Sequence, residues 1–502
     1  MNAFASNRIF LLLLVIGGVL GAVVMGSWVA KGNFMNIALI LSGIFGALIF
    51  LSLGRMYWYM IPLALAAQLP AIPLASKSID TGELVVVACT AIYIARLAMK
   101  KDDLHLVRWT HLPILFSFVW VVIVWTLNPV GVSILGSATL GGRHYFKIVL
   151  AFCSFVIVAS QAATEKDFFR CMVLVTLGSA GNTAYGLFSY FFGGGAEMMM
   201  TSGAGEGYTW HQILVQPTIL ISSLIFARFK PSEVIGFQRP GILFLYALTI
   251  FLALLSGKRA GLAAVLMAPV ISAILYREYR FALILSALGA ACVFALVAGH
   301  GSLYSLPFPA QRALSWLPGD WDPSLAHFKG GSDIFREELR KLAVDEIKLN
   351  PVIGKGYAME YNEMVAAQGL LQFGTKSEDQ YMYYAIGKSW HNRWLGYAAD
   401  FGIPFSVLLG FIYLVGLGVS FRLSRILPHP SGRQVFAIFA FMWILRNVLN
   451  SHTSGHTALD ALYDWWLYGL LFALLAATKT RNWKPAQDVF PGRSEAAPLP
   501  GV

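Results

Sequence analysis

The sequence predicts an all-α membrane protein, a polytopic bundle of about 12–14 transmembrane helices with one large, partly helical periplasmic loop. Of its 502 residues, 57% are hydrophobic and only 13% are charged, whereas soluble domains have about 25% charged residues. Long runs with almost no charge, such as 9–30 and 279–299, reach the roughly 17–25 residues that a helix needs to cross hydrocarbon. Backbone polar groups in lipid must be satisfied within their own segment, so these runs are expected to be helices.

The expected spans follow the apolar runs along the chain. The first run is longer than the apolar core of a signal peptide, and we interpret it as an uncleaved helix. The spans are expected near 9–30, 34–53, 56–75, 82–98, 112–128, 145–163, 168–192, 211–228, 240–256, 260–276, 279–299, 397–421, 434–449 and 459–478.

The basic residues predict the orientation of this bundle. The net charge is +11, and Lys and Arg gather in alternate linkers, which is typical of cytoplasmic loops. No basic stripe is interleaved with aromatic residues, so we predict no nucleic-acid partner. Both termini are expected to be cytoplasmic, because the short outer linkers then hold only Lys31, Lys77, Arg143, Lys258 and Arg259.

Four segments follow from this orientation. Residues 1–299 form the first part of the bundle, 300–396 the periplasmic loop, 397–478 the last part of the bundle, and 479–502 a disordered cytoplasmic tail rich in Pro, Gly and Ala.

An amphipathic helix is expected within the periplasmic loop. Over 333–350, apolar residues such as Phe335, Leu339 and Ile347 recur at helical spacing, while charged residues fill the other face. Pro351 ends the pattern.

Charged residues are almost absent from the apolar runs. Asp460 and Asp464 lie in the outer half of the last span, and Lys147 lies near the outer end of its span. Transporters and pumps usually place charges at mid-membrane depth. The pattern therefore favours a site at the outer surface.

One candidate motif is Ser256-Gly257-Lys258-Arg259-Ala260-Gly261, which joins two apolar runs with almost no linker. Snorkelling of the two cations to lipid headgroups would explain them without a function. The flanking glycines, however, allow close approach of a ligand, and an arginine can bind a diphosphate in a bidentate way. These residues alone favour neither the lipid-anchoring interpretation nor the ligand-binding one.

A second motif, Trp390-His391-Asn392-Arg393-Trp394, lies where the loop returns to the membrane. Tryptophans are common at membrane interfaces, but that preference does not explain the three polar residues between them. A lone histidine is more often structural than catalytic. Here it could also accept a proton from a sugar hydroxyl.

Together with two further elements, these motifs resemble those of the O-antigen ligase and polymerase superfamily. The resemblance covers about residues 240–425 in order, spacing and topology. The further elements are Asn350-Pro351-Val352-Ile353-Gly354-Lys355-Gly356 and, after His391-Asn392-Arg393-Trp394-Leu395, the segment Asp400-Phe401-Gly402-Ile403.

The resemblance implies a metal-independent, inverting glycosyltransferase without a cofactor. Its donor would be a glycan on undecaprenyl diphosphate, and its acceptor a sugar hydroxyl. Arg259 would bind the diphosphate and His391 would activate the acceptor. The site would face the periplasm at the bacterial inner membrane, in contact with membrane lipids.

The leading prediction is a polymerase of O-antigen or exopolysaccharide, with a chain-length regulator as a further partner. The alternative is an O-antigen ligase that transfers the glycan to lipid A core, and the second alternative is a non-catalytic transporter or flippase. Ligase-type members carry a further arginine before the span near 211–228, and 203–211 has none here.

A second cation for the diphosphate is therefore expected elsewhere. The candidates are Lys258, Arg143, Arg312, Arg336, Arg340 and Arg393. Acceptor binding is assigned to Asn392, Arg393, His452 and His456. A metal site built from His211, His391, His452 and His456 is the less favoured alternative, because no carboxylate has clear ligand spacing with them.

Overall fold

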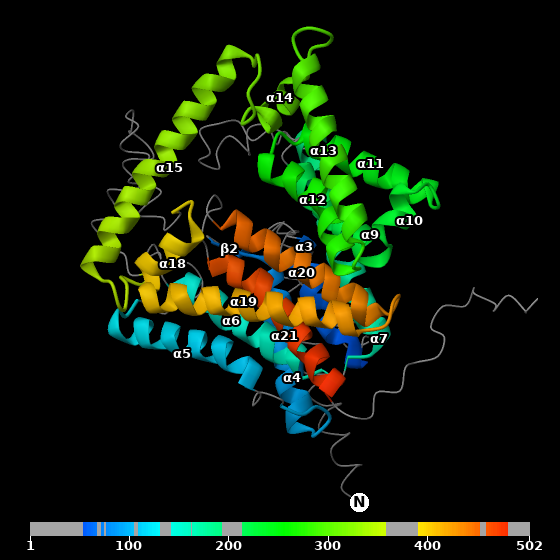
Figure 1. Cartoon of the computed structure of the whole chain (residues 1–502). Helices are drawn as coiled ribbons and strands as arrows, with labels where there is room; N and C mark the ends of the chain where they lie inside the picture. Colours follow the sequence, from blue (N-terminus) through cyan, green and yellow to red (C-terminus); the bar gives the residue numbers. More distant parts are fainter. Residues whose placement is uncertain are drawn as a thin grey trace, which may run out of the picture. The chain divides into compact units, whose positions relative to one another are not determined.

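The computed structural model describes residues 54–67, 72–74, 77–104, 109–130, 142–161, 163–192, 213–357, 390–451 and 458–479 (Figure 1). The chain divides into the units Met1–Tyr59 and Met60–Val502, and of the first unit the structure describes the 3-10 helix η1 (Gly54–Tyr59). The predicted spans 9–30 and 34–53, and the predicted tail beyond Lys479, lie outside the described residues.

The all-α polytopic class is confirmed. The described part of the chain holds six helices long and apolar enough to cross a membrane, together with six shorter apolar helices of 10–17 residues. The elements of the second unit are α3 (Met60–Ala67), β1 (Ile72–Leu74), β2 (Lys77–Ile79), α4 (Thr81–Ala98), η2 (Trp109–His111), α5 (Leu112–Leu127), α6 (Gly142–Ala159), α7 (Glu165–Phe192), α9 (Val215–Arg228), α10 (Pro231–Ile235), α11 (Pro240–Leu255), α12 (Arg259–Leu275), α13 (Tyr279–Gly299), α14 (Phe308–Leu314), α15 (Pro323–Leu349), α18 (Arg393–Phe401), α19 (Ile403–Ile426), α20 (Gly432–Asn450) and α21 (Ala458–Lys479).

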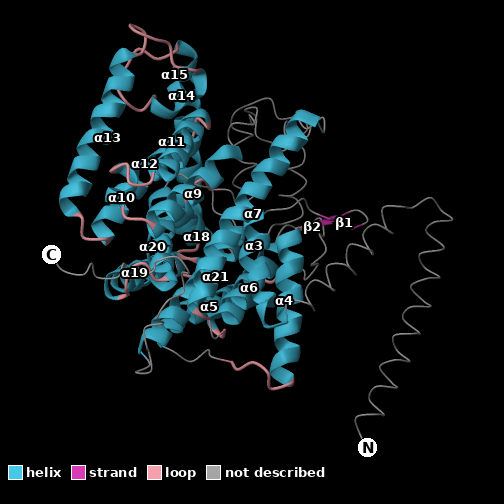
Figure 2. Ribbon diagram, turned by 90° about the vertical axis from the view of Figure 1, so that its right-hand side faces the viewer, coloured by secondary structure: helices cyan, strands magenta, loops and turns pink. Residues whose placement is uncertain are grey.

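The core lies where α21 packs along α6, and where α20 packs against α7, α9 and α19 (Figure 2). Burial of large apolar side chains stabilises these contacts. On the α6–α21 contact, Phe155 and Phe472 are buried, and their ring centroids lie 6.4 Å apart in an edge-on arrangement. The α13 helix packs against α12 and buries much less of its surface.

Two predicted spans are altered in the structure. A single span was expected over 56–75. In the structure, the helix α3 ends at Ala67, and residues 72–74 form strand β1, which pairs antiparallel with β2. Pro73 lies in β1, and proline lacks the amide hydrogen that a continued helix would need there. The span expected over 397–421 is broken at Gly402 into α18 and α19.

The helix predicted over 333–350 is longer than expected. It begins at Pro323 and ends at Leu349 as α15, which leads from the α14 side of the molecule to α18 (Figure 1). Its buried residues Leu339 and Ala343 face the α18 side, where Ala343 packs with Trp390 and Ala399. The long helix thus connects the region of the first candidate motif with that of the second.

Candidate functional site

The first motif forms a tight turn at the start of α12. Gly257 has a φ of +66°, a left-handed conformation that favours glycine. A Cβ at this position would lie 3.4 Å from the Pro309 carbonyl oxygen and 3.7 Å from Cδ of Arg312. The α14 segment therefore lies directly over the turn and brings Arg312 to it.

Arg259 points toward α14. Its Nε–H donates to the Arg312 carbonyl oxygen over 3.4 Å, and its Nη2 donates to the Ser315 hydroxyl over 2.9 Å. These two bonds orient the guanidinium on the protein surface around α14. A side chain that only snorkels to headgroups would not need such partners.

His391 lies close to charges from both α12 and α15. Its half-buried ring meets Phe335 edge-on, with the centroids 5.5 Å apart. Burial, and then the positive charges of Arg336 and Lys258, lower the pKa of His391 below its ordinary value of 6.5. At neutral pH the imidazole is therefore uncharged and able to accept a proton. The charge of Lys258 in the first motif therefore acts on the histidine of the second.

The residues after His391 anchor it. The Asn392 side chain caps α18 by accepting a bond from the Leu395 amide over 3.0 Å. The Arg393 amide donates to the Ser451 carbonyl oxygen over 2.7 Å. With its φ of +49°, a conformation uncommon for a residue with a side chain, His391 is held just before this anchored helix start.

The Arg393 side chain turns inward. It is buried, its Nη1 donates to the Tyr413 hydroxyl over 2.7 Å, and the same nitrogen lies 3.5 Å from Oδ2 of Asp464. Asp464 Oδ1 in turn accepts bonds from Trp443 and Asn447, each over 2.9 Å. Arg393 thus fixes α18 to α19 and α21.

Two elements of the resemblance interlock beside this helix. The amides of Lys355 and Gly356 donate to the carbonyl oxygens of Ala399 and Asp400 over 3.1 and 2.7 Å. The amide of Ile403 donates to the carbonyl oxygen of Pro351 over 2.8 Å. The ends of α15 and α18 are therefore joined by backbone bonds that do not depend on side chains.

Glycine is required at this junction. Gly402 has a φ of +84°, and a Cβ there would collide with the carbonyl oxygen of Val352. Asp400 is fully buried beside it, and its Oδ1 accepts a bond from the Trp390 indole over 3.4 Å. This acidic residue therefore holds Trp390, the neighbour of His391, in place.

The candidates for a second cation separate into two groups. Arg312 lies at the Gly257 turn, and Arg336 lies near His391. Arg143, in contrast, lies 3.2 Å from Oδ2 of Asp80 and 3.6 Å from Oε2 of Glu83. Arg340 lies on the exposed face of α15, 3.5 Å from Glu337. His211, His452 and His456 lie outside the described residues.

Arg446 on α20 was not among the predicted site residues. Its Nη1 donates to Gln216 over 3.4 Å, its Nη2 donates to Asn447 over 3.2 Å, and its guanidinium lies 4.9 Å from the Trp443 ring centroid. Together with Ala260 it lines a cavity of about 100 Å³ between α9, α12 and α20. An arginine inside the apolar run 434–449 was the signal available in the sequence.

Further charged side chains lie near the ends of the helices, in addition to those that the sequence analysis named. Besides Arg446, the buried pair Lys147 and Glu83 joins α6 to α4 over 3.2 Å. Opposite charges can be buried when they are paired. Such pairs hold helices together and do not by themselves indicate transport.

Residues 244–411 match the O-antigen ligase family. No curated protein matches the sequence. The matched segment contains Lys258 and Arg259 at the start of α12, all of α15, and His391 before α18. The match to the O-antigen ligase family covers a third of the chain, residues 244–411, and supports the resemblance to the O-antigen ligase and polymerase superfamily over that segment.

Proposed function

We propose that the protein is a membrane glycosyltransferase that moves a glycan from undecaprenyl diphosphate to a sugar hydroxyl. The observation that carries the proposal is the half-buried His391, which is held before α18 and feels the positive charges of Lys258 and Arg336, with Arg259 next to Lys258 at the start of α12. This arrangement supports a base for the acceptor in the same region as cations for the donor.

The reaction follows from these roles. His391 takes the proton of the acceptor hydroxyl as the oxygen attacks the anomeric carbon. The bond from that carbon to the diphosphate oxygen breaks on the opposite face, so the configuration inverts. The diphosphate leaves with the electron pair, and the positive charges of Arg259 and Lys258 stabilise it. His391 then releases the proton to water.

We place this site on the periplasmic face of the bacterial inner membrane, with both termini cytoplasmic. The support is the charge asymmetry of the short linkers. The site is built from α15 and the start of α18, which lie within the segment proposed to be outside, and from the start of α12, which follows a short linker proposed to be outside. Donor lipid can then arrive from the side and acceptor glycan from the periplasm.

Polymerisation is the favoured form of the reaction, with a chain-length regulator as partner. Its support is the absence of an arginine from 203–211, where ligase-type relatives have one. Analysis of surface glycan in a deletion strain tests it. Products with a single repeat unit are expected for a lost polymerase. Long chains that stay on the lipid carrier would instead identify a ligase that acts on lipid A core.

A further inference from the structure

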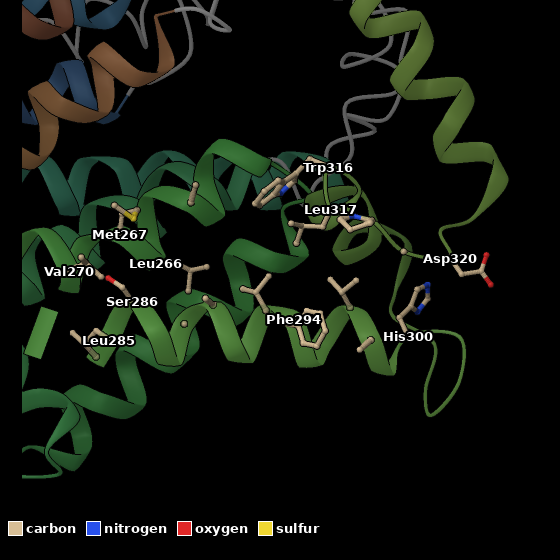
Figure 3. Close-up of a pocket in the computed structure, with 18 residues that line it drawn as sticks. Leu266, Met267, Val270, Leu285, Ser286, Phe294, His300, Trp316, Leu317 and Asp320 are labelled. Atoms are coloured by element: carbon tan, nitrogen blue, oxygen red, sulfur yellow. The ribbon is translucent and has the colours of Figure 1, made fainter. Parts of the chain in front are cut away.

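An apolar groove runs between α12 and α13, the α12–α13 groove, with a volume of about 830 Å³. Figure 3 shows Leu266 on α12 and Phe294 on α13 lining it, with Trp316 and Leu317 beside it and His300 and Asp320 at one end. Its volume lies within the range of about 300–1,000 Å³ that is common for ligand pockets.

The groove adjoins the candidate site for the diphosphate. Ala263, which lines it, lies one helical turn after Arg259 on α12. Trp316, which also lines it, directly follows Ser315, the acceptor of the Arg259 bond. Because α12 and α13 are successive helices joined by a short turn, the start of α12 with Arg259 lies at the same end of the groove as His300 and Asp320. The polar groups of the groove therefore gather at this end, whereas the other end, between Val270 and Leu285, is apolar.

The groove is long and lies within membrane-spanning helices. Its lining on α13 reaches from Leu285 to Ala298, which is about 20 Å along a helix that rises roughly 1.5 Å per residue. The hydrocarbon layer is about 30 Å thick. Met267 and Phe294 are exposed although they line the groove, so a chain can enter it from the lipid.

We infer that the α12–α13 groove binds the polyisoprenyl chain of the lipid-linked donor, with the diphosphate at Arg259. This inference rests on the proposed function. An ordinary acyl chain would suit the apolar lining equally well. The continuity between the groove and Arg259 favours a lipid whose headgroup carries the diphosphate.

Gly289 provides a variant that fills the groove without disturbing the protein. It lines the groove on α13, and a Cβ there meets no atom within 4 Å. Gly418 on α19 has the same open surroundings, is exposed, and does not line the groove. Gly289→Phe and Gly418→Phe are therefore a matched pair.

The first experiment compares two donors that carry the same glycan, one on undecaprenyl diphosphate and one on a diphosphate with only three isoprene units. Because lipid tails are as apolar as the groove, the groove mainly orients the chain. We expect Gly289→Phe to raise the KM for the long donor about ten-fold, near 1.4 kcal/mol, and to leave the short donor unchanged. Gly418→Phe should behave as wild type with both.

If the Gly289→Phe variant has the same KM for the long donor as the wild-type protein, the assignment of the groove is overturned. If the wild-type protein transfers from neither donor, the proposed function fails instead. A second experiment does not need activity. Undecaprenyl diphosphate bearing a diazirine should label residues 285–298, and unlabelled undecaprenyl diphosphate should compete. Equal competition by a phospholipid would show that the groove holds bulk lipid.

Discussion

Nη1 of Arg393 lies 3.5 Å from Oδ2 of Asp464, and both side chains are buried. The pair links the start of α18, two residues after His391, to α21, which lies beyond α19 and α20 in the chain. The position of His391 relative to the bundle therefore depends on the charge of Asp464, which is distant in the chain but close in the fold.

Asp464→Asn should lower both thermal stability and transfer rate. Removal of one partner from a buried ion pair costs about 3–5 kcal/mol, because the other charge stays buried. The change is measured as the melting temperature in detergent. The double variant Arg393→Met/Asp464→Leu should regain much of that stability, since paired apolar replacements are often neutral. An unchanged melting temperature for Asp464→Asn would contradict the role of the pair.

Arg259→Lys should lower transfer strongly although it keeps the charge. Lysine cannot bond both the Arg312 carbonyl oxygen and the Ser315 hydroxyl as the guanidinium fork does. Loss of one donor to a developing oxyanion typically costs about 10²–10³ in rate. Initial rates of purified protein measure it, with Arg340→Lys on the exposed face of α15 as control. Normal turnover of Arg259→Ala would leave Arg259 as a membrane anchor only.

His391→Ala should abolish transfer and leave donor binding nearly intact, whereas Arg259→Ala should weaken both. A general base acts only on the step that removes the hydroxyl proton, and typically contributes about 10²–10⁴-fold. Binding of lipid-linked donor and transfer rate are measured on the same preparations. Equal loss of donor affinity in the two variants would place His391 in the diphosphate site.

The transfer rate should fall as the pH drops through the pKa of His391, because the protonated ring cannot accept a proton. Burial and the charges of Arg336 and Lys258 lower this pKa below 6.5. The transfer rate should therefore stay constant as the pH is lowered to 6.5 and begin to fall only below it. Arg336→Gln removes one charge, raises the pKa and moves the acid limb to higher pH. The control Arg340→Gln, one turn further along α15, should leave the acid limb of the pH profile unchanged. If Arg336→Gln also leaves the acid limb unchanged, His391 is not the titrating base.

Reporter fusions at Lys329 and Trp483 test the proposed orientation. Residue 329 lies in the segment assigned to the periplasm, and residue 483 follows the last helix, which we assign to the cytoplasmic side. Opposite signals are expected from a reporter active only in one compartment. Equal signals would remove the basis for a periplasmic site.

Most of the helices and both candidate motifs could be predicted from the sequence, because long apolar runs and Gly–cation or His–Asn patterns are local features. The inward turn of Arg393 could not, since its partner Asp464 is distant in the chain and only the fold brings them together. The break at Gly402 depends likewise on the Val352 carbonyl oxygen. Arg446 could have been recognised as an arginine within an apolar run.

The backbone bonds between 350–356 and 399–403 have an evolutionary consequence. They fix where the chain leaves α15 and where it returns to α18, independently of the residues between. Insertions or substitutions over 358–389 can then accumulate without displacing the junction at Gly402. Under the proposed function, relatives could then diverge in the glycan they accept while His391, Lys258 and Arg259 stay the same.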